Sequence, residues 1–235
     1  MMKESLIVAI DGPSGVGKTT VAQLLAKRLR VPMLDTGAMY RTVALDALEA
    51  GVALDDAKAM RRRLKELDLE LRADSEGGVE VWLRGEPVGQ RIRTPEISRA
   101  ASRVSVYSAV RKRMVEIQRQ FGRRGGGVLE GRDIGTVVFP ETPHKFFLTA
   151  RAEVRAERRH RELVAAGRGG PIEEVLRDLE ERDRRDRERK DSPLTQTDEH
   201  REIDTSDLLP AEIVERIVGI IRHPESAGGG EEASD

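Results

Sequence analysis

The chain has 235 residues, of which 35% are charged, yet its formal net charge is only -1 and it contains no cysteine. The balance of acids and bases argues against a general nucleic-acid binder, and the lack of cysteine excludes disulfides, thiolate metal sites and cysteine nucleophiles. We expect an α/β protein with one insertion, located in the cytoplasm and away from membranes, because the N-terminal apolar run is too short for a signal peptide or a membrane span.

The most specific motif follows that apolar run. Residues 6–10 are typical of a buried strand, the next segment matches G-x-x-x-x-G-K-[ST], and residues 19–30 carry a helical pattern. Backbone N–H groups and a helix N-terminus would then point to one place, which is typical of a polyphosphate-binding loop. Lys18 would reach the β- and γ-phosphates, and the Thr19 hydroxyl would bind Mg²⁺. The predicted ATP-binding residues are Gly12, Pro13, Ser14, Gly15, Val16, Gly17, Lys18, Thr19 and Thr20.

The following segments alternate between strand and helix patterns. A short strand is predicted at residues 31–34, and a helix that opens in residues 35–41 runs to about residue 50. Residues 57–66 then predict a basic helix, and two alternating runs around a Gly-containing turn at residues 74–78 predict an antiparallel hairpin. A hairpin inside an alternating strand–helix chain indicates an insertion.

The rest of the chain returns to the alternating pattern. Strands are predicted at residues 127–130, 145–148 and 201–204, and helices at residues 93–121, 152–166, 172–189 and 211–221. Such alternation predicts a parallel sheet covered by helices on both faces. We expect one domain at residues 1–223 and a disordered tail at residues 224–235, which are rich in Gly, Glu and Ser.

Arginines and a carboxylate follow the predicted strands. Arg41, Arg132 and the arginine-rich run 182–189 lie past strands, where open parallel sheets bind their ligands, so more than one phosphate group is expected there. Glu130 lies at a strand end where phosphate-loop enzymes place an acid that holds Mg²⁺ directly or through water. The sequence offers no evident catalytic base, but a phosphate acceptor with a second pKa near 6 needs none.

Five segments together resemble the bacterial cytidylate kinase family, within the nucleoside monophosphate kinases: residues 12–18, 34–41, 92–94, 130–140 and 181–189. The resemblance implies a P-loop NTPase-type three-layer α/β fold with a central five-stranded parallel sheet. It also implies a nucleoside-monophosphate-binding insert at about residues 55–95 and a helical lid at about residues 168–192. Relatives often carry Ser at position 36, Asp at position 130 and Gly at position 19, where this chain has Thr36, Glu130 and Thr19.

The implied activity is ATP-dependent phosphorylation of CMP and dCMP to CDP and dCDP by a monomer with Mg²⁺. The implied catalytic residues are Lys18, Arg132, Arg182 and Arg189. The implied CMP-binding residues are Thr36, Tyr40, Arg41, Ser102, Arg111, Arg132, Asp133, Arg182 and Asp186, and the metal residues are Thr19 and Glu130. Within this set the resemblance assigns Arg182 and Asp186 to the ribose and Arg189 to the transferring phosphoryl group.

Other functions are compatible with parts of the sequence. Another small-acceptor kinase with the same core, acting on UMP, AMP or a shikimate-like alcohol, is the alternative within the enzymes. A GTPase switch is disfavoured because the chain contains no asparagine, so the N-K-x-D guanine motif cannot occur. Binding of nucleic acid through the arginine-rich run is disfavoured by the nearly equal numbers of acids and bases.

Overall fold

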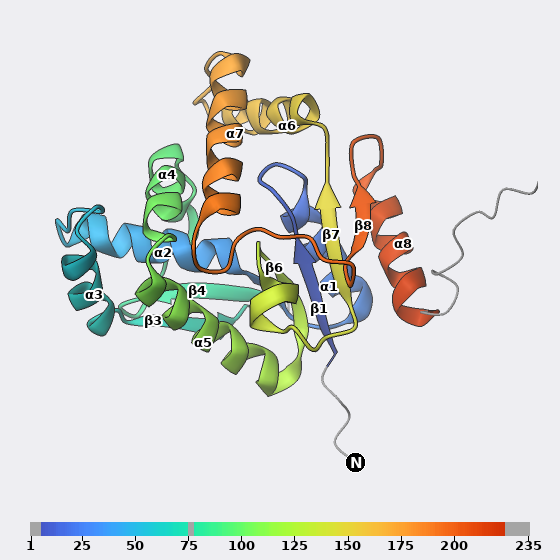
Figure 1. The fold of residues 1–235 in the computed structure, drawn as a ribbon, viewed down its shortest axis with the longest axis horizontal. Helices are drawn as coiled ribbons and strands as arrows, with labels where there is room; N and C mark the ends of the chain where they lie inside the picture. Colours follow the sequence, from blue (N-terminus) through green and yellow to red (C-terminus); the bar gives the residue numbers. More distant parts are fainter. Residues whose placement is uncertain (1–5, 75–77, 224–235) are drawn as a thin grey trace, which may run out of the picture.

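Five parallel strands form the central sheet, in the order β2–β6–β1–β7–β8 (Figure 1). Their bounds are β1 Ile7–Asp11, β2 Met33–Asp35, β6 Gly127–Glu130, β7 Lys145–Thr149 and β8 Arg201–Asp204. The five-stranded parallel sheet expected from the sequence is therefore confirmed. The computed structural model describes residues 6–74 and 78–223; the disorder predicted for residues 224–235 and the tip of the predicted turn lie outside the described residues.

Helices cover both faces of this sheet because the strand residues alternate between two apolar cores. In β1, Val8 and Ile10 belong to one buried cluster, while Ala9 between them belongs to the other. The first cluster is covered by α1 (Lys18–Leu29) and α8 (Pro210–Arg222), and the second by α2 (Thr36–Glu49) and α5 (Ser108–Gly125). The three-layer arrangement leaves the carboxyl ends of the strands open at one edge.

The insertion packs on α2 as a small separate layer. It contains α3 (Ala57–Lys65), β3 (Leu69–Ala73), β4 (Val79–Leu83), β5 (Glu86–Pro87) and the short 3₁₀ helix η1 (Gly89–Ile92), and residues 57–92 are called the insert below. The predicted antiparallel hairpin is present, with Leu71 opposite Val81, and β5 extends it to a three-stranded sheet. Met60 and Leu83 from the insert join the same buried cluster as α2.

The single helix predicted at residues 93–121 is wrong, since the segment forms α4 (Pro95–Val104) and then α5. Thr94 begins α4 by accepting a hydrogen bond from the Ile97 N–H at 3.1 Å. The break falls at Tyr107, whose extended backbone precedes α5 and whose hydroxyl donates to Leu54 O at 2.8 Å. Neither Gly nor Pro marks this break, so the apolar periodicity alone could not reveal it.

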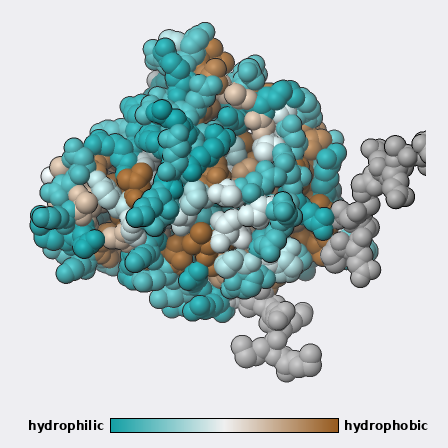
Figure 2. Space-filling model, viewed as in Figure 1, coloured by the Kyte–Doolittle hydropathy of each residue, from teal (hydrophilic) through white to brown (hydrophobic). Residues whose placement is uncertain are grey.

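Two helices, α6 (Ala152–Ala165) and α7 (Ile172–Glu188), rise above the carboxyl ends of the central strands (Figure 1). They contact each other through a small apolar cluster containing Ala156, Val175 and Leu179. Their outer surface is mostly hydrophilic on the face that Figure 2 shows. No helix among residues 6–74 and 78–223 has the length and apolar character to cross a bilayer. The α6–α7 pair is thus placed directly over the edge where parallel sheets bind ligands.

Candidate active site

The loop between β1 and α1 is shaped by glycines. Gly12, Gly15 and Gly17 have φ values of 145°, 82° and 89°. A Cβ on Gly12 would lie 2.2 Å from the backbone oxygen of Leu148, so no side chain fits there. Gly17 begins α1 without any capping side chain, which leaves N–H groups of the first helical turn available to an anion. The loop has the form predicted for phosphate binding.

Two residues of opposite charge, Lys18 and Glu130, are buried beside this loop. Lys18 donates from Nζ to Pro13 O at 2.5 Å, and burial, with Arg132 nearby, lowers its pKa to about 7. Burial, with the charge of Asp35 nearby, raises the pKa of Glu130 to about 7. Both groups are therefore shifted toward their uncharged forms. Anionic phosphates would favour a charged Lys18, and a cation would favour a charged Glu130.

The surroundings of Glu130 fit Mg²⁺. Its Oε1 is buried without a hydrogen-bond partner, and its carboxylate interacts with the Thr19 side chain. No group of three or more His, Cys, Asp or Glu residues that could hold a metal occurs in the part of the chain that the structure describes. Mg²⁺ commonly binds through one or two protein oxygens together with substrate phosphates and water, so Thr19 and Glu130 suffice.

A second polar group lies beyond the loop and is built from distant parts of the chain. The side chains come from α2, α5, α7 and the turn before the short helix η2 (Ile134–Val138). Arg111 donates from Nη2 to Asp133 Oδ2 at 2.5 Å, and its guanidinium lies 5.3 Å from the centre of the Tyr40 ring. Arg189 lies 3.3 Å from Asp186. We call Tyr40, Arg111, Asp133, Asp186 and Arg189 the acceptor cluster.

Several polar atoms in and near the acceptor cluster are buried without a hydrogen-bond partner. They are the Tyr40 hydroxyl, Ser102 Oγ on α4, Arg41 Nε, Arg111 Nε and Arg189 Nη2. Burial raises the pKa of Tyr40, with Asp133 adding to the effect, so its hydroxyl stays protonated and can donate. Buried polar groups are nearly always satisfied in folded proteins. Five unpaired atoms in one region therefore indicate that a polar ligand binds there.

Three arginines lie between the loop and the acceptor cluster. Arg41 pairs with Asp35 at 2.7 Å, and Arg132 pairs with Asp186 at 2.9 Å. Arg182 makes no hydrogen bond or ion pair within the described segments, and burial, with Arg132 nearby, lowers its pKa to about 10. Arg182 is thus a charged group that interacts with Asp186 and Asp183 at longer range, without an ion pair to either.

Arg182 and Arg189 have different neighbours in the site. Lys18 feels the charges of Arg132 and Arg182, so these arginines reach the loop, although both also interact with Asp186 of the acceptor cluster. Arg189 instead lies 3.9 Å from Asp133, inside the acceptor cluster. The resemblance implies Arg189 at the phosphoryl group and Arg182 at the ribose, and these two roles remain predictions.

Thr36, the predicted acceptor-phosphate residue, lies next to Glu130. Thr36 is buried at the start of α2 and donates from Oγ1 to Glu130 O at 2.7 Å. Two residues at the loop were missed, Arg155 on α6 and Asp183 on α7. A usable signal existed for both: Arg155 lies in the first turn after the β7 strand, and Asp183 belongs to the same charged run as Asp186.

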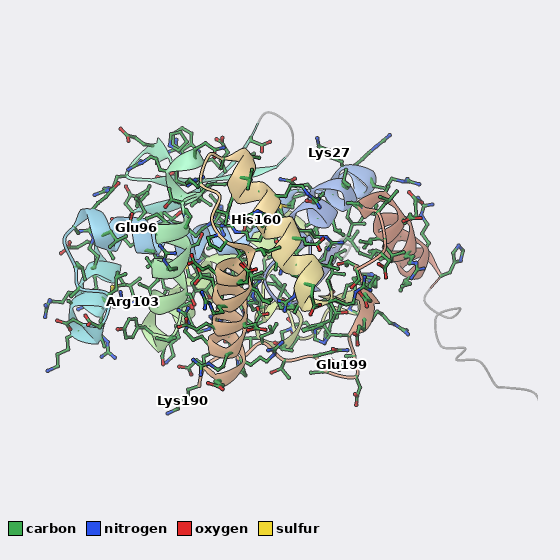
Figure 3. All side chains as sticks on the ribbon, turned by 90° about the horizontal axis from the view of Figure 1, so that it is seen from above. Lys27, Glu96, Arg103, His160, Lys190 and Glu199 are labelled. Atoms are coloured by element: carbon green, nitrogen blue, oxygen red, sulfur yellow. The ribbon has the colours of Figure 1, made fainter. Side chains whose placement is uncertain are left out.

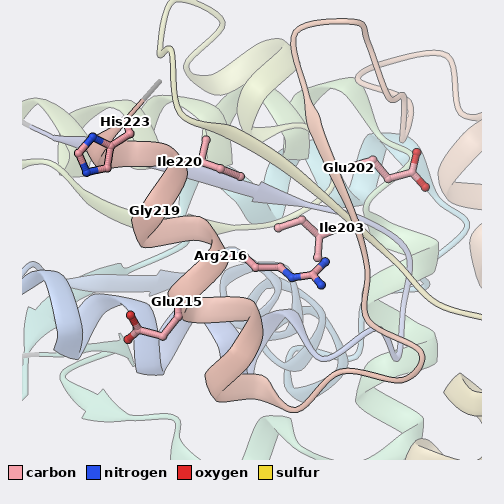
Figure 4. Close-up of a pocket in the computed structure, with 7 residues that line it drawn as sticks. All are labelled: Glu202, Ile203, Glu215, Arg216, Gly219, Ile220 and His223. Atoms are coloured by element: carbon pink, nitrogen blue, oxygen red, sulfur yellow. The ribbon is translucent and has the colours of Figure 1, made fainter. Parts of the chain in front are cut away.

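One of two cavities in the described residues borders the site. Seen from above, α6 and α7 lie over the junction of the insert and the central sheet, with His160 marking α6 (Figure 3). A cavity of about 890 Å³ separates α1 from the sheet of the insert and is lined by Thr19, Asp35 and Arg93 among others. A smaller hollow of about 420 Å³ lies between β8 and α8, at residues such as Ile203, and contains no predicted site residue (Figure 4).

Known proteins match almost the whole chain. The model of the family described as cytidylate kinase matches residues 8–223. The chain is 47% identical over 221 residues to the cytidylate kinase of Syntrophotalea carbinolica (strain DSM 2380 / NBRC 103641 / GraBd1), covering 94% of this chain and 93% of that protein. It is 46% identical over 213 residues to the cytidylate kinase of Geobacter sp. (strain M21), covering 91% of each.

Solved structures share the fold at much lower identity. An uncharacterized protein from Eubacterium ventriosum ATCC 27560 has a TM-score of 0.51 and 15% identity, covering 94% of this chain and 99% of that one. This likeness concerns the fold alone. The family model and the two relatives carry the assignment, and they agree with the loop and the sheet order described above: the chain belongs to the cytidylate kinase family.

Proposed function

We propose that this protein transfers the γ-phosphoryl group of ATP to CMP or dCMP, giving ADP and CDP or dCDP. The observation that carries the proposal is the set of five unpaired buried polar atoms beside a phosphate loop, with arginines between the two. The relatives are cytidylate kinases, and their activity supplies the identity of the acceptor. Two polyanions must be brought together in this reaction, and positive charge is what such a site needs.

The donor would bind in the glycine loop. The backbone N–H groups of residues 15–20 and the Lys18 ammonium would hold the phosphates of ATP. Mg²⁺, held by Thr19, Glu130 and the phosphates, would offset the negative charge that develops during transfer. Arg182, which forms no ion pair in the described chain, would contact the transferring phosphoryl group from the other side.

The acceptor would bind next to the acceptor cluster. Arg41 and Arg132, with the Thr36 hydroxyl, would surround its phosphate, while Asp186 and Arg189 would contact the sugar and base. The acceptor phosphate is already largely dianionic at pH 7 and needs no general base. The α6–α7 pair would act as a lid and the insert as the second closing element, which together would exclude competing water.

The acceptor cluster also provides a basis for selecting cytosine. Cytosine presents an amino donor beside a ring acceptor, and uracil reverses both. Asp133 would accept from the amino group, and Arg111 would donate to the ring acceptor, with the Ser102 hydroxyl as a further partner. With uracil, Asp133 would face another acceptor and Arg111 another donor. Each such buried mismatch would cost about 1–3 kcal/mol of binding free energy.

Steady-state kinetics of the purified protein with ATP and Mg²⁺ test the proposal. CMP, dCMP, UMP, AMP and shikimate are compared as acceptors by coupled detection of ADP, with Lys18→Met as the inactive control. CMP and dCMP are expected to be turned over far faster than the others. Comparable rates with UMP would contradict the base-reading assignment, and a preference for AMP or shikimate would identify a different kinase on the same fold.

A further inference from the structure

Asp183 on α7 has no role in the proposed reaction, yet it is bound to the phosphate loop. It is 1% exposed, its Oδ1 accepts from the Ser14 N–H at 3.1 Å, and its Oδ2 accepts from Arg155. Arg155 also donates from Nη1 to the Ser14 carbonyl at 3.1 Å. Both backbone polar groups of one loop residue are therefore held by a side-chain pair from α6 and α7.

The start of α6 lies directly against the loop. A Cβ on Gly15 would come within 3.1 Å of the Arg155 Cβ. Arg155 is only 7% exposed, and its Nε is buried without a hydrogen-bond partner. A buried guanidinium with a spare N–H, beside a loop that binds phosphate, can donate one more hydrogen bond to an anionic oxygen. This spare donor indicates that the Asp183–Arg155 pair faces a ligand on the donor side.

The position of Asp183 on α7 separates it from the acceptor residues. Asp186 lies three residues further along the same helical face and pairs with Arg132 and Arg189. One face of α7 thus carries two buried carboxylates with different partners. The first contacts the phosphate loop, and the second contacts arginines of the acceptor side.

We propose that Asp183 is a positioning residue for the phosphoryl donor: it fixes the backbone of the phosphate loop through the Ser14 N–H and holds Arg155 beside the loop, where the spare Nε can donate to a phosphate of a nucleoside triphosphate. The inference rests on the proposed function and adds a donor-specific role to it. Without the carboxylate, Arg155 would be buried without its charged partner, and the Ser14 amide would lose its acceptor. Donor binding would then weaken, while the acceptor site would keep its own carboxylate, Asp186.

Binding measurements with each nucleotide separately test this assignment. Asp183→Asn keeps an oxygen that can accept from Ser14 but removes the charge that holds Arg155. Isothermal titration of the full chain with a non-hydrolysable ATP analogue should show about tenfold weaker binding, the scale of a charge-assisted hydrogen bond. The affinity for CMP should stay within about twofold of the wild type. Asp186→Asn should give the opposite pattern.

The matched control is Asp178→Asn, on the same helix but at an exposed side chain that pairs weakly with Arg99 at 3.6 Å. Neither affinity should change in it. Arg155→Lys, which keeps the charge, should lose less donor affinity than Arg155→Gln, and this pair tests the inference even if Asp183→Asn does not fold.

Two results would overturn the inference: unchanged donor affinity in Asp183→Asn, or equal weakening of both nucleotides. Donor binding needs no acceptor, so the inference and the proposed function can fail separately. A wild-type protein that binds the analogue through Asp183 but phosphorylates no CMP would contradict only the proposed function.

Discussion

The donor and acceptor halves of this site are built in different ways. The donor half is a continuous loop in which glycine backbone geometry and N–H groups do the binding. The acceptor half consists of side chains from α2, α4, α5 and α7 that meet only in the folded chain. A site made of contiguous backbone can be recognised from local sequence, whereas a site made of dispersed side chains depends on the packing of whole helices.

The two halves also differ in how their charges are balanced. At the donor side, Lys18 and Glu130 are both shifted toward neutrality, with pKa values of about 7. At the acceptor side, Arg111 pairs with Asp133 and Arg132 with Asp186, so the charges are kept. Although burial alone would raise it, the pKa of Asp186 is lowered by Arg132 and Arg182. Lys18 and Glu130 in the donor half therefore become fully charged only when their ligands bind. The charged groups of the acceptor half are already charged without a ligand.

The largest expected effect comes from the arginine between the halves. Arg182→Ala should lower kcat by about 10³-fold, the scale of an arginine that stabilises a transferring phosphoryl group. The coupled ADP assay measures it, with the exposed Arg177→Ala on the same helix as the control. Arg189→Ala should act mainly on KM for CMP. A loss of kcat confined to Arg189→Ala would instead support the roles that the family resemblance implies, with Arg189 at the phosphoryl group and Arg182 at the ribose.

Selectivity between CMP and UMP should distinguish the residues that read the base from those that bind the acceptor phosphate. Asp133→Asn removes the acceptor for the cytosine amino group, so the ratio of kcat/KM for UMP to that for CMP should rise about tenfold. Thr36→Ala, near the acceptor phosphate, should lower both values and leave the ratio unchanged. Should Asp133→Asn lower UMP and CMP turnover equally, Asp133 does not read the base.

Proton uptake should distinguish the donor half from the acceptor half. At pH 8 Lys18 is mostly neutral, because its pKa is lowered to about 7 and the charged form is lost as pH rises through that value. Phosphates favour the charged form, so ATP binding without Mg²⁺ should take up protons at this pH. Titration calorimetry in two buffers with different ionisation enthalpies measures the uptake. CMP binding to the wild type, and ATP binding to Lys18→Met, should show little proton uptake. A heat of ATP binding that does not depend on the buffer in the wild type would contradict the lowered pKa of Lys18.

The smallest effect concerns one hydroxyl of the acceptor cluster. Tyr40→Phe removes a buried hydroxyl that has no partner, so the free energy of unfolding should stay level or rise by about 1 kcal/mol. If that hydroxyl binds CMP, KM for CMP should rise about threefold, and KM for ATP should not change. Thermal unfolding and acceptor kinetics check the two effects. Higher stability with an unchanged KM would remove Tyr40 from the binding site.

Much of the fold follows from local patterns in the sequence. The glycine loop after β1, the five strand segments and the antiparallel hairpin each depend on neighbouring residues: turn glycines, short apolar runs and period-two alternation. The loop could be recognised because its function resides in contiguous backbone. The division of residues 93–121 into α4 and α5 could not be recognised from the sequence. At the break, Tyr107 makes a hydrogen bond to Leu54, which is far away in the chain.

The roles within α7 show what only the tertiary structure decided. Arg182 and Arg189 are seven residues apart, about 10 Å along a helix axis, so they lie near the same face of α7 on either side of Asp186. Which end of α7 lies over the loop depends on how the helix packs, and the contact of Asp183 with Ser14, 169 residues away in sequence, shows it. The sequence by itself determined that a phosphate loop and clustered arginines exist. Only folding decided which residues these side chains pair with, because helix direction and long-range pairing are not local properties.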